Sequence, residues 1–293
     1  MNSPAPLPSA SRRPPRWLVT VLTIGVFLLL DRFHLDLFRE VAGDWEGYRR
    51  LAALAVLGYG AQLLVPLGLG AVLLGPRCAL ASLGLDRSIL SGLAVGLAGT
   101  SVLPVGYAAI AAFAPPDQAL YVVMRGSVLP GIGEEVLYRA FLFGFLFRFA
   151  GWGFLPAALA GAAFFGAAHL YQGEGLADAA AIFAITALGA VWFAWLYAEW
   201  DFNIWVPAAF HVLMNMYWEL FAISDTALGP LAANVLRFAA ILLAVIITVL
   251  AVRRRSGRLV RGRVWLWGGP GDRSGAGVGT SPCERSAAFS PRW

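Results

Sequence analysis

Charge is scarce in this sequence: only 13% of its 293 residues are Asp, Glu, Lys or Arg, whereas 59% are hydrophobic. A soluble globular chain is about a quarter charged and about half apolar. A surface that faces water on every side cannot be built from so few charges, and the mean hydropathy is +0.70. The composition therefore excludes an ordinary soluble protein and predicts a chain whose solvent is largely lipid.

Cysteine is almost missing as well, since Cys78 and Cys283 are the only two in the chain. They lie far apart and form no CxxC pair, so they indicate neither a disulfide framework nor a thiolate metal site. The formal charge of +5 comes from arginines gathered near the chain ends, which membrane topology explains better than nucleic-acid binding does. No nucleic-acid partner is expected.

Long continuous apolar runs fill the sequence, whereas alternating segments of about ten residues would indicate a β-barrel. Backbone amides in a bilayer must be satisfied internally, which helices achieve within each run. We therefore predict an all-α fold, a polytopic transmembrane helical bundle with about eight spans. The predicted spans are 17–30, 51–75, 89–114, 119–150, 153–170, 179–199, 204–223 and 230–252.

Two segments, one predicted span and one stretch between spans, are harder to interpret. The run 119–150 is too long for one simple span at about 1.5 Å per residue. We expect Gly126, Pro130, Gly131 and Gly133 to break it and to leave a main helix from about Gly131 onward. Residues 31–50 are charged and aromatic, and they predict a loop or a surface-lying helix.

The arginine clusters also predict the orientation of the chain. Arg12, Arg13 and Arg16 precede the first span, and the run from Arg253 to Arg255 follows the last. The positive-inside rule then places both termini in the cytoplasm of an integral, multi-pass cell-membrane protein. The expected parts are a disordered N-terminus (1–16), N-terminal spans and loops (17–88), a core (89–223), a C-terminal span (224–252) and a disordered basic tail (253–293).

Ionisable residues inside spans are costly, so each is a candidate functional residue. Three stretches contain almost all of them: Gly133–Arg139, Phe165–His169 and His211–Asn215. Glu135 and Arg139 are four residues apart, which places them on one helix face and predicts an ion pair. Glu134 points about 100° away and is left free.

The same spacing places His211 and Asn215 on one face, where both side chains can point at one spot. Phe165 precedes His169 by one turn and could form a wall against its imidazole. We therefore expect Glu134, His169, His211 and Asn215 to converge from three spans. A single intramembrane His or Asn, or a single ion pair, often only joins helices. Three clusters together, with a doubled Glu, favour a functional site. His34 lies in the polar segment and is expected to be solvated.

These stretches, read as EExxxR, FxxxH and HxxxN in this order on separate helices, resemble the three motifs of the CPBP family. These are the CAAX proteases and bacteriocin-processing enzymes, which include the type II CAAX prenyl endopeptidases. The resemblance covers residues 89–223. It implies an intramembrane endopeptidase with a helical core, acting on a peptide or protein substrate reached at or within the lipid bilayer.

The resemblance also implies a role for each motif residue. Glu134 matches the general base that activates water, and His169 the histidine that helps to hold this water. His211 and Asn215 match the pair that stabilises the oxyanion. Glu135 and Arg139 match the supporting pair, and Phe165 is grouped with them as a supporting residue.

Metal dependence stays open at this stage. Two His and one Glu are a known zinc set, so Glu134, His169 and His211 would be the ligands of a zinc ion. The sequence has no HExxH motif, and Asn215 is a poor zinc ligand but a good hydrogen-bond donor. We favour the mechanism without a metal.

Two other classes of function stay open. Buried Glu, His and Arg also occur in transporters and channels, although the sequence shows no internal repeat. A membrane scaffold without catalysis, as in bacteriocin self-immunity, is the second alternative. The chain looks bacterial, and a bacterial protein need not meet a prenylated substrate, so the substrate and its prenylation are left open.

Overall fold

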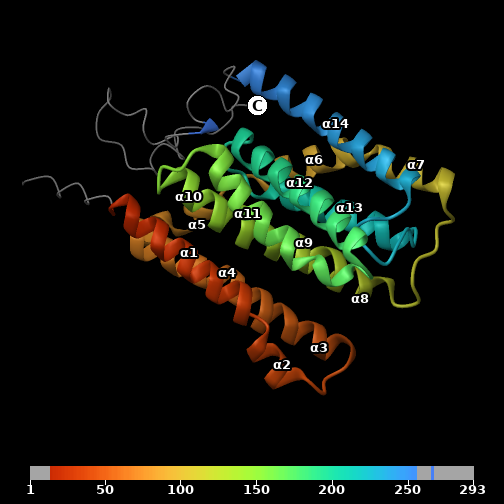
Figure 1. Cartoon of the computed structure of the whole chain (residues 1–293), viewed down its shortest axis with the longest axis horizontal. Helices are drawn as coiled ribbons and strands as arrows, with labels where there is room; N and C mark the ends of the chain where they lie inside the picture. Colours follow the sequence, from red (N-terminus) through yellow and green to blue (C-terminus); the bar gives the residue numbers. More distant parts are fainter. Residues whose placement is uncertain (1–13, 256–264, 267–293) are drawn as a thin grey trace, which may run out of the picture.

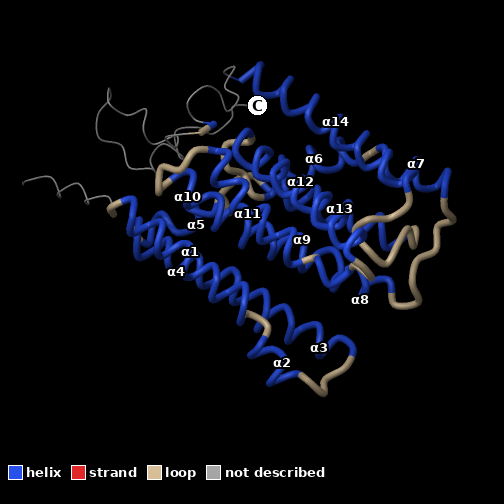
Figure 2. Tube along the Cα trace, in the orientation of Figure 1, coloured by secondary structure: helices blue, strands red, loops and turns tan. Residues whose placement is uncertain are grey.

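A computed structural model of the chain describes residues 14–255 and 265–266, and these residues contain helices and loops but no β-strand (Figures 1 and 2). The all-α prediction is therefore confirmed. The predicted N-terminal segment 1–16 and the tail 253–293 fall mostly outside the described residues, as do Arg12, Arg13, Cys283 and both chain ends. Their predicted cytoplasmic location stays a prediction.

The helices follow one another along the whole described chain. The α-helices are α1 (Arg16–Phe33), α2 (Asp36–Ala42), α3 (Gly47–Ala53), α4 (Gly60–Leu74), α5 (Ala79–Leu83), α6 (Ile89–Thr100), α7 (Val102–Ile110), α8 (Ala119–Val123), α9 (Leu129–Glu134), α10 (Gly144–Arg148), α11 (Phe154–Ala168), α12 (Leu176–Glu199), α13 (Trp205–Leu220) and α14 (Leu231–Arg255). Three π-helical segments are η1 (Leu54–Tyr59), η3 (Met124–Val128) and η4 (Glu135–Phe143), and two short 3-10 turns are η2 (Pro76–Cys78) and η5 (Leu170–Gln172).

Six of the described helical segments are long and apolar enough to cross a membrane, against about eight predicted. They are Arg16–Ala42, Gly47–Leu74, Ile89–Ile110, Phe154–Gln172, Leu176–Glu199 and Leu231–Arg254. The two other predicted spans became the run from α8 to α10 and helix α13. The first carries too many charges for an apolar span, and α13 has only 16 residues. Both are the elements that carry the polar motifs.

The expected break in the run 119–150 is wrong. Helix continues from α8 through η3, α9 and η4 to α10. Pro130 lacks an N–H and would leave a gap in an α-helical ladder, but it lies in the first turn of α9, directly after the wider π-helical turn of η3. A π-helical turn shifts the hydrogen bonds to i→i+5 and so accommodates such a residue without ending the helix.

The segment 31–50 is largely helical, since α1 continues to Phe33 and α2 and α3 follow. Helices α2 and α3 extend the candidate spans Arg16–Ala42 and Gly47–Leu74, so a loop is wrong here and a surface-lying helix stays a prediction. His34 differs from the expectation of a solvated loop residue. It is half-buried, and its Nδ1 lies 2.7 Å from the carbonyl oxygen of Leu30.

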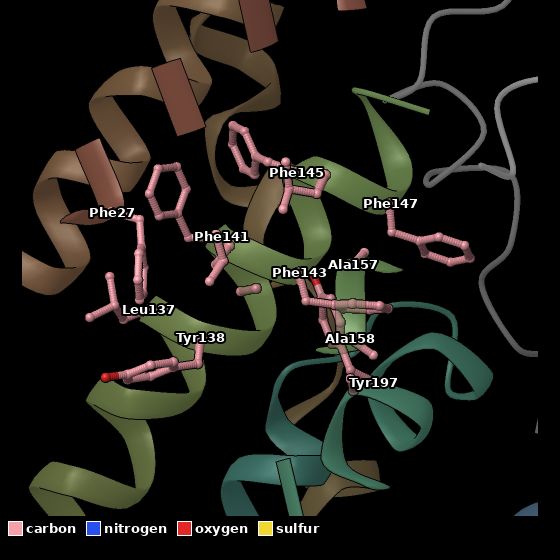
Figure 3. Packing of buried hydrophobic residues seen from close by; sticks show 14 of the residues in the cluster. Phe27, Leu137, Tyr138, Phe141, Phe143, Phe145, Phe147, Ala157, Ala158 and Tyr197 are labelled. Carbon is pink, nitrogen blue, oxygen red and sulfur yellow. The ribbon is translucent and has the colours of Figure 1, made fainter. Parts of the chain in front are cut away.

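The centre of the bundle is the helix formed by η4 and α10. Every residue from 135 to 147 is buried. Phe141, Phe143, Phe145 and Phe147 fill the space around it (Figure 3). In Figure 1, α1 and α4 run along one side, α14 along the opposite side, and α9, α11, α12 and α13 lie between them. A charge on the central helix therefore has no access to water and must be compensated by protein groups.

Candidate active site

The side chains predicted to converge line one cavity of about 990 Å³. Glu134 is the last residue of α9, His169 follows the end of α11, and His211 and Asn215 lie on α13. Phe165 and Arg139 also line this cavity. The structure thus brings together residues from three separate elements, as the motif spacing predicted.

Glu135 is the most deeply buried carboxylate of the site, with no exposed side-chain surface. Its Oε1 lies 3.0 Å from an Nη1 of Arg139 and 2.8 Å from Nδ1 of His211. The predicted Glu135–Arg139 pair is therefore present, and it has a third member that comes from α13. The same oxygen of Glu135 therefore faces the Arg139 guanidinium on its own helix and the His211 imidazole on α13.

Arg139 is compensated mainly by charge and by aromatic faces. Its nitrogens make no hydrogen bond of good geometry, although Glu135 lies within ion-pair distance. Its guanidinium carbon lies 4.2 Å from the ring centre of Phe165, 5.3 Å from that of Phe193 and 5.9 Å from that of Tyr138. A cation over ring faces is stabilised by the negative face of the quadrupole, and guanidinium is the cation best suited to such stacking.

Glu134 has a contrasting environment. Its side chain is 24% exposed and opens into the cavity. Its Oε2 lies 3.9 Å from Nε2 of His211, which is too long for a direct hydrogen bond. Two adjacent glutamates thus differ sharply, because Glu135 is committed to two partners and Glu134 keeps its carboxylate available to the cavity.

Both site histidines are held through Nδ1. Nδ1 of His169 lies 2.7 Å from the carbonyl oxygen of Phe165, and the two rings are 4.6 Å apart. A carbonyl oxygen only accepts, so this Nδ1 carries the proton. Nδ1 of His211 lies 2.8 Å from Oε1 of Glu135, the oxygen that also faces Arg139, so a proton on this Nδ1 gives the same arrangement for the second histidine. In the neutral form of each ring, Nε2 then carries a lone pair.

Asn215 lines the cavity but is partly committed elsewhere. Its Nδ2 donates to the carbonyl oxygen of Gly126 at 3.2 Å. His211 and Asn215 therefore share a helix face, as predicted, but their first partners are different. The amide nitrogen carries two hydrogens, so one N–H of Asn215 is still available.

Sequence reasoning missed several neighbours of the motifs. Tyr59 lines the cavity, and a Cβ placed on Gly133 would lie 2.1 Å from Cδ1 of its ring. A side chain at position 133 would clash with the Tyr59 ring, so the position directly before Glu134 requires glycine. Tyr138 donates to Asp31 of α1 at 2.8 Å. A carboxylate directly after the first apolar run was the signal that could have revealed this contact.

A zinc ion would require Glu134, His169 and His211 to act as ligands. Among the described residues, no group of three His, Cys, Asp or Glu side chains is arranged so that it could hold a metal ion. The Nε2 lone pairs of the histidines suit a metal, but the three donors are not gathered around one point. This arrangement does not fit a three-ligand zinc site, and no step is derived through a metal.

Comparison with known proteins found a family whose sequences are similar to the segment that carries the site. Residues 116–217 match the Rce1-like family, described as type II CAAX prenyl endopeptidase Rce1-like. No curated protein and no solved structure matches the chain. The matched segment includes the doubled Glu, His169, His211 and Asn215, and lies inside the predicted core 89–223. By this match the segment that carries the motifs, about a third of the chain, is similar to the type II CAAX prenyl endopeptidases, which supports the resemblance to the CPBP family.

Proposed function

We propose that this protein is an intramembrane endopeptidase that hydrolyses a peptide bond in or near the bilayer, with Glu134 as the general base. The observation that carries the proposal is the contrast between the two adjacent glutamates in one cavity. Glu135 is buried and holds two partners, whereas Glu134 is open to the cavity and has only a 3.9 Å contact with His211. A base must be able to reach its water, and only Glu134 can do so.

In the proposed reaction, Glu134 removes a proton from a water molecule while the water oxygen attacks the carbonyl carbon of the substrate. The C–N bond of the tetrahedral intermediate then breaks, and the proton passes from Glu134 to the leaving amine. Nε2 of neutral His169 has a lone pair and can accept the second hydrogen of the water, which orients its oxygen. The bond from Nδ1 of His169 to Phe165 keeps that lone pair available.

Asn215 and His211 are the proposed donors to the oxyanion. Asn215 can donate its second N–H while the first stays on the Gly126 carbonyl. His211 can donate only in its doubly protonated form, because Nδ1–H is already bonded to Glu135. The carboxylates of Glu134 and Glu135, on either side of the ring, are suited to stabilise that cation. Fixed donors of this kind act where charge develops in the transition state.

The proposed substrate is a peptide or protein segment that enters from the bilayer. A cavity of about 990 Å³ is at the large end of the range for ligand sites and accommodates several residues. Apolar and aromatic residues of α12 and α14 line it beside the polar motifs, including Leu188, Trp192, Phe238 and Ile241. The family description names prenylated CAAX substrates, and a prenyl group on the substrate is one form of this proposal.

A hydrolysis assay tests the proposal. The purified protein in lipid nanodiscs is incubated with membrane-anchored peptides, with and without a prenyl group, and products are identified by mass spectrometry. Cleavage by the wild type and not by Glu134→Gln supports the assignment. No cleavage of any peptide, together with proton or solute flux in liposomes that depends on Glu134, would identify a transporter instead.

A further inference from the structure

Helix α1 lies outside the segment that matches the family, yet it contacts the helix of the site. The contact is a hydrogen bond from the Tyr138 hydroxyl to Oδ1 of Asp31, 2.8 Å long. The two residues are 107 positions apart in the chain. Asp31 is half-buried in the last turn of α1, and a carboxylate placed in an apolar helix is expected to have a functional partner.

Tyr138 is well placed to transmit this contact to the site. It follows Glu134 by four residues on the same continuous helix, and only 6% of its surface is exposed. Its ring meets the ring of Phe165 edge-on, with 5.1 Å between the centres. On its other side it packs against Phe27 of α1 at 5.3 Å, and Figure 3 shows the two rings next to each other.

Phe165 in turn fixes His169. The carbonyl of Phe165 holds Nδ1 of His169 at 2.7 Å, and the Phe165 ring faces both that imidazole and the Arg139 guanidinium. A chain of direct contacts thus runs from Asp31 through Tyr138 and Phe165 to His169. Each link is a hydrogen bond or a ring contact between buried or half-buried groups.

We infer that Asp31 and Tyr138 are positioning residues: their hydrogen bond fixes the Tyr138 ring, which holds Phe165 and thereby His169 at the correct distance from Glu134. This inference rests on the proposed function, because it assigns α1 a part in placing the water. Neither residue touches the substrate in this scheme. Small errors in the placement of a reacting group reduce the rate strongly, and a displacement well under 1 Å is expected to cost about 10-fold.

Three variants separate the hydrogen bond from general packing. Tyr138→Phe keeps the ring and removes the hydroxyl, and Asp31→Leu removes the acceptor with little change in volume. Asp31→Asn is the matched control, because its amide oxygen still accepts the hydroxyl proton. We expect kcat to fall about 10-fold in the first two variants with KM unchanged, and the control to stay near the wild type. The double variant should lose no more than either single variant, because both remove the same bond.

A second measurement reads the position of His169 without activity. The chain has three histidines, so ¹⁵N-histidine labelling gives few signals, which single His→Gln variants assign. The Nδ1–H signal of His169 should shift in Tyr138→Phe and Asp31→Leu and stay in Asp31→Asn. The Nδ1–H signal of His211, which is held by Glu135, should move less.

The outcomes are distinct. Unchanged kcat and an unchanged His169 signal in Tyr138→Phe and Asp31→Leu, with only a lower melting temperature, would overturn the inference. Losses that add up in the double variant would also overturn it. If the wild type cleaves no peptide at all, the proposed function fails, and the His169 signal alone then decides whether this chain of contacts positions the imidazole.

Discussion

The two adjacent glutamates should respond in opposite ways to the same substitution. Glu134→Gln changes a residue that is 24% exposed and has only a 3.9 Å contact with His211, so stability should change by less than about 0.5 kcal/mol. Loss of the general base should reduce kcat by roughly 100-fold or more. Glu135→Gln removes a charge that is fully buried between Arg139 and His211.

The magnitude for Glu135 follows from these contacts. Removing one partner of a buried ion pair leaves the other charge uncompensated and costs about 3–5 kcal/mol. The aromatic rings around Arg139 remain and reduce this cost, so we expect about 3 kcal/mol. For a chain of this size, each kcal/mol lowers the melting temperature by about 2–4 °C, which gives roughly 6–12 °C.

The difference in melting temperature between the two variants is measured by thermal unfolding in the same detergent. The fluorescence of the 11 tryptophans follows the unfolding. Hydrolysis is assayed well below both melting temperatures. The reasoning is refuted if Glu134→Gln melts far below the wild type or if Glu135→Gln melts with it. Full activity in Glu134→Gln would refute the assignment of the base.

Four further outcomes are expected. Arg139→Lys should lower the free energy of unfolding by about 2 kcal/mol and reduce activity, because a lysine ammonium cannot lie flat between rings, and the melting curve checks this. Asn215→Ala should reduce kcat ~100- to 1000-fold through loss of an oxyanion donor; a loss below about 10-fold would remove Asn215 from that role. Activity should survive chelation, without stoichiometric zinc in the purified protein; one equivalent of zinc, with activity lost on its removal and restored on re-addition, would overturn the metal-free scheme. Reporter fusions should find both termini in the cytoplasm, and opposite locations would mean an odd number of spans.

Much of the fold could be predicted because the bilayer leaves few choices. Long continuous apolar runs indicated helices, and the i,i+4 spacing predicted the pair of Glu135 and Arg139 that the structure contains. These are local properties of one helix.

Contacts between distant residues could not be predicted in this way. Glu135 and His211 are 76 positions apart, and Asn215 and Gly126 are 89 apart. Helical spacing determines which face carries a side chain, but the packing of helices determines what that face meets. The second partner of Glu135 and the first partner of Asn215 therefore appear only in the structure.

The expected break at Gly126 and Pro130 is absent from the structure, and the geometry found there instead bears on the site as well as on the helix boundary. Residues that disfavour an α-helix did not end it: Gly126 lies in η3, where its carbonyl oxygen accepts from Asn215, and Pro130 follows in the first turn of α9. The third π-helical segment, η4, begins at Glu135, directly after Glu134. The change from α to π geometry thus falls between the two glutamates. Gly126 and Pro130, which disfavour a regular α-helix, thus accompany a local change of helix geometry beside the site instead of ending the helix.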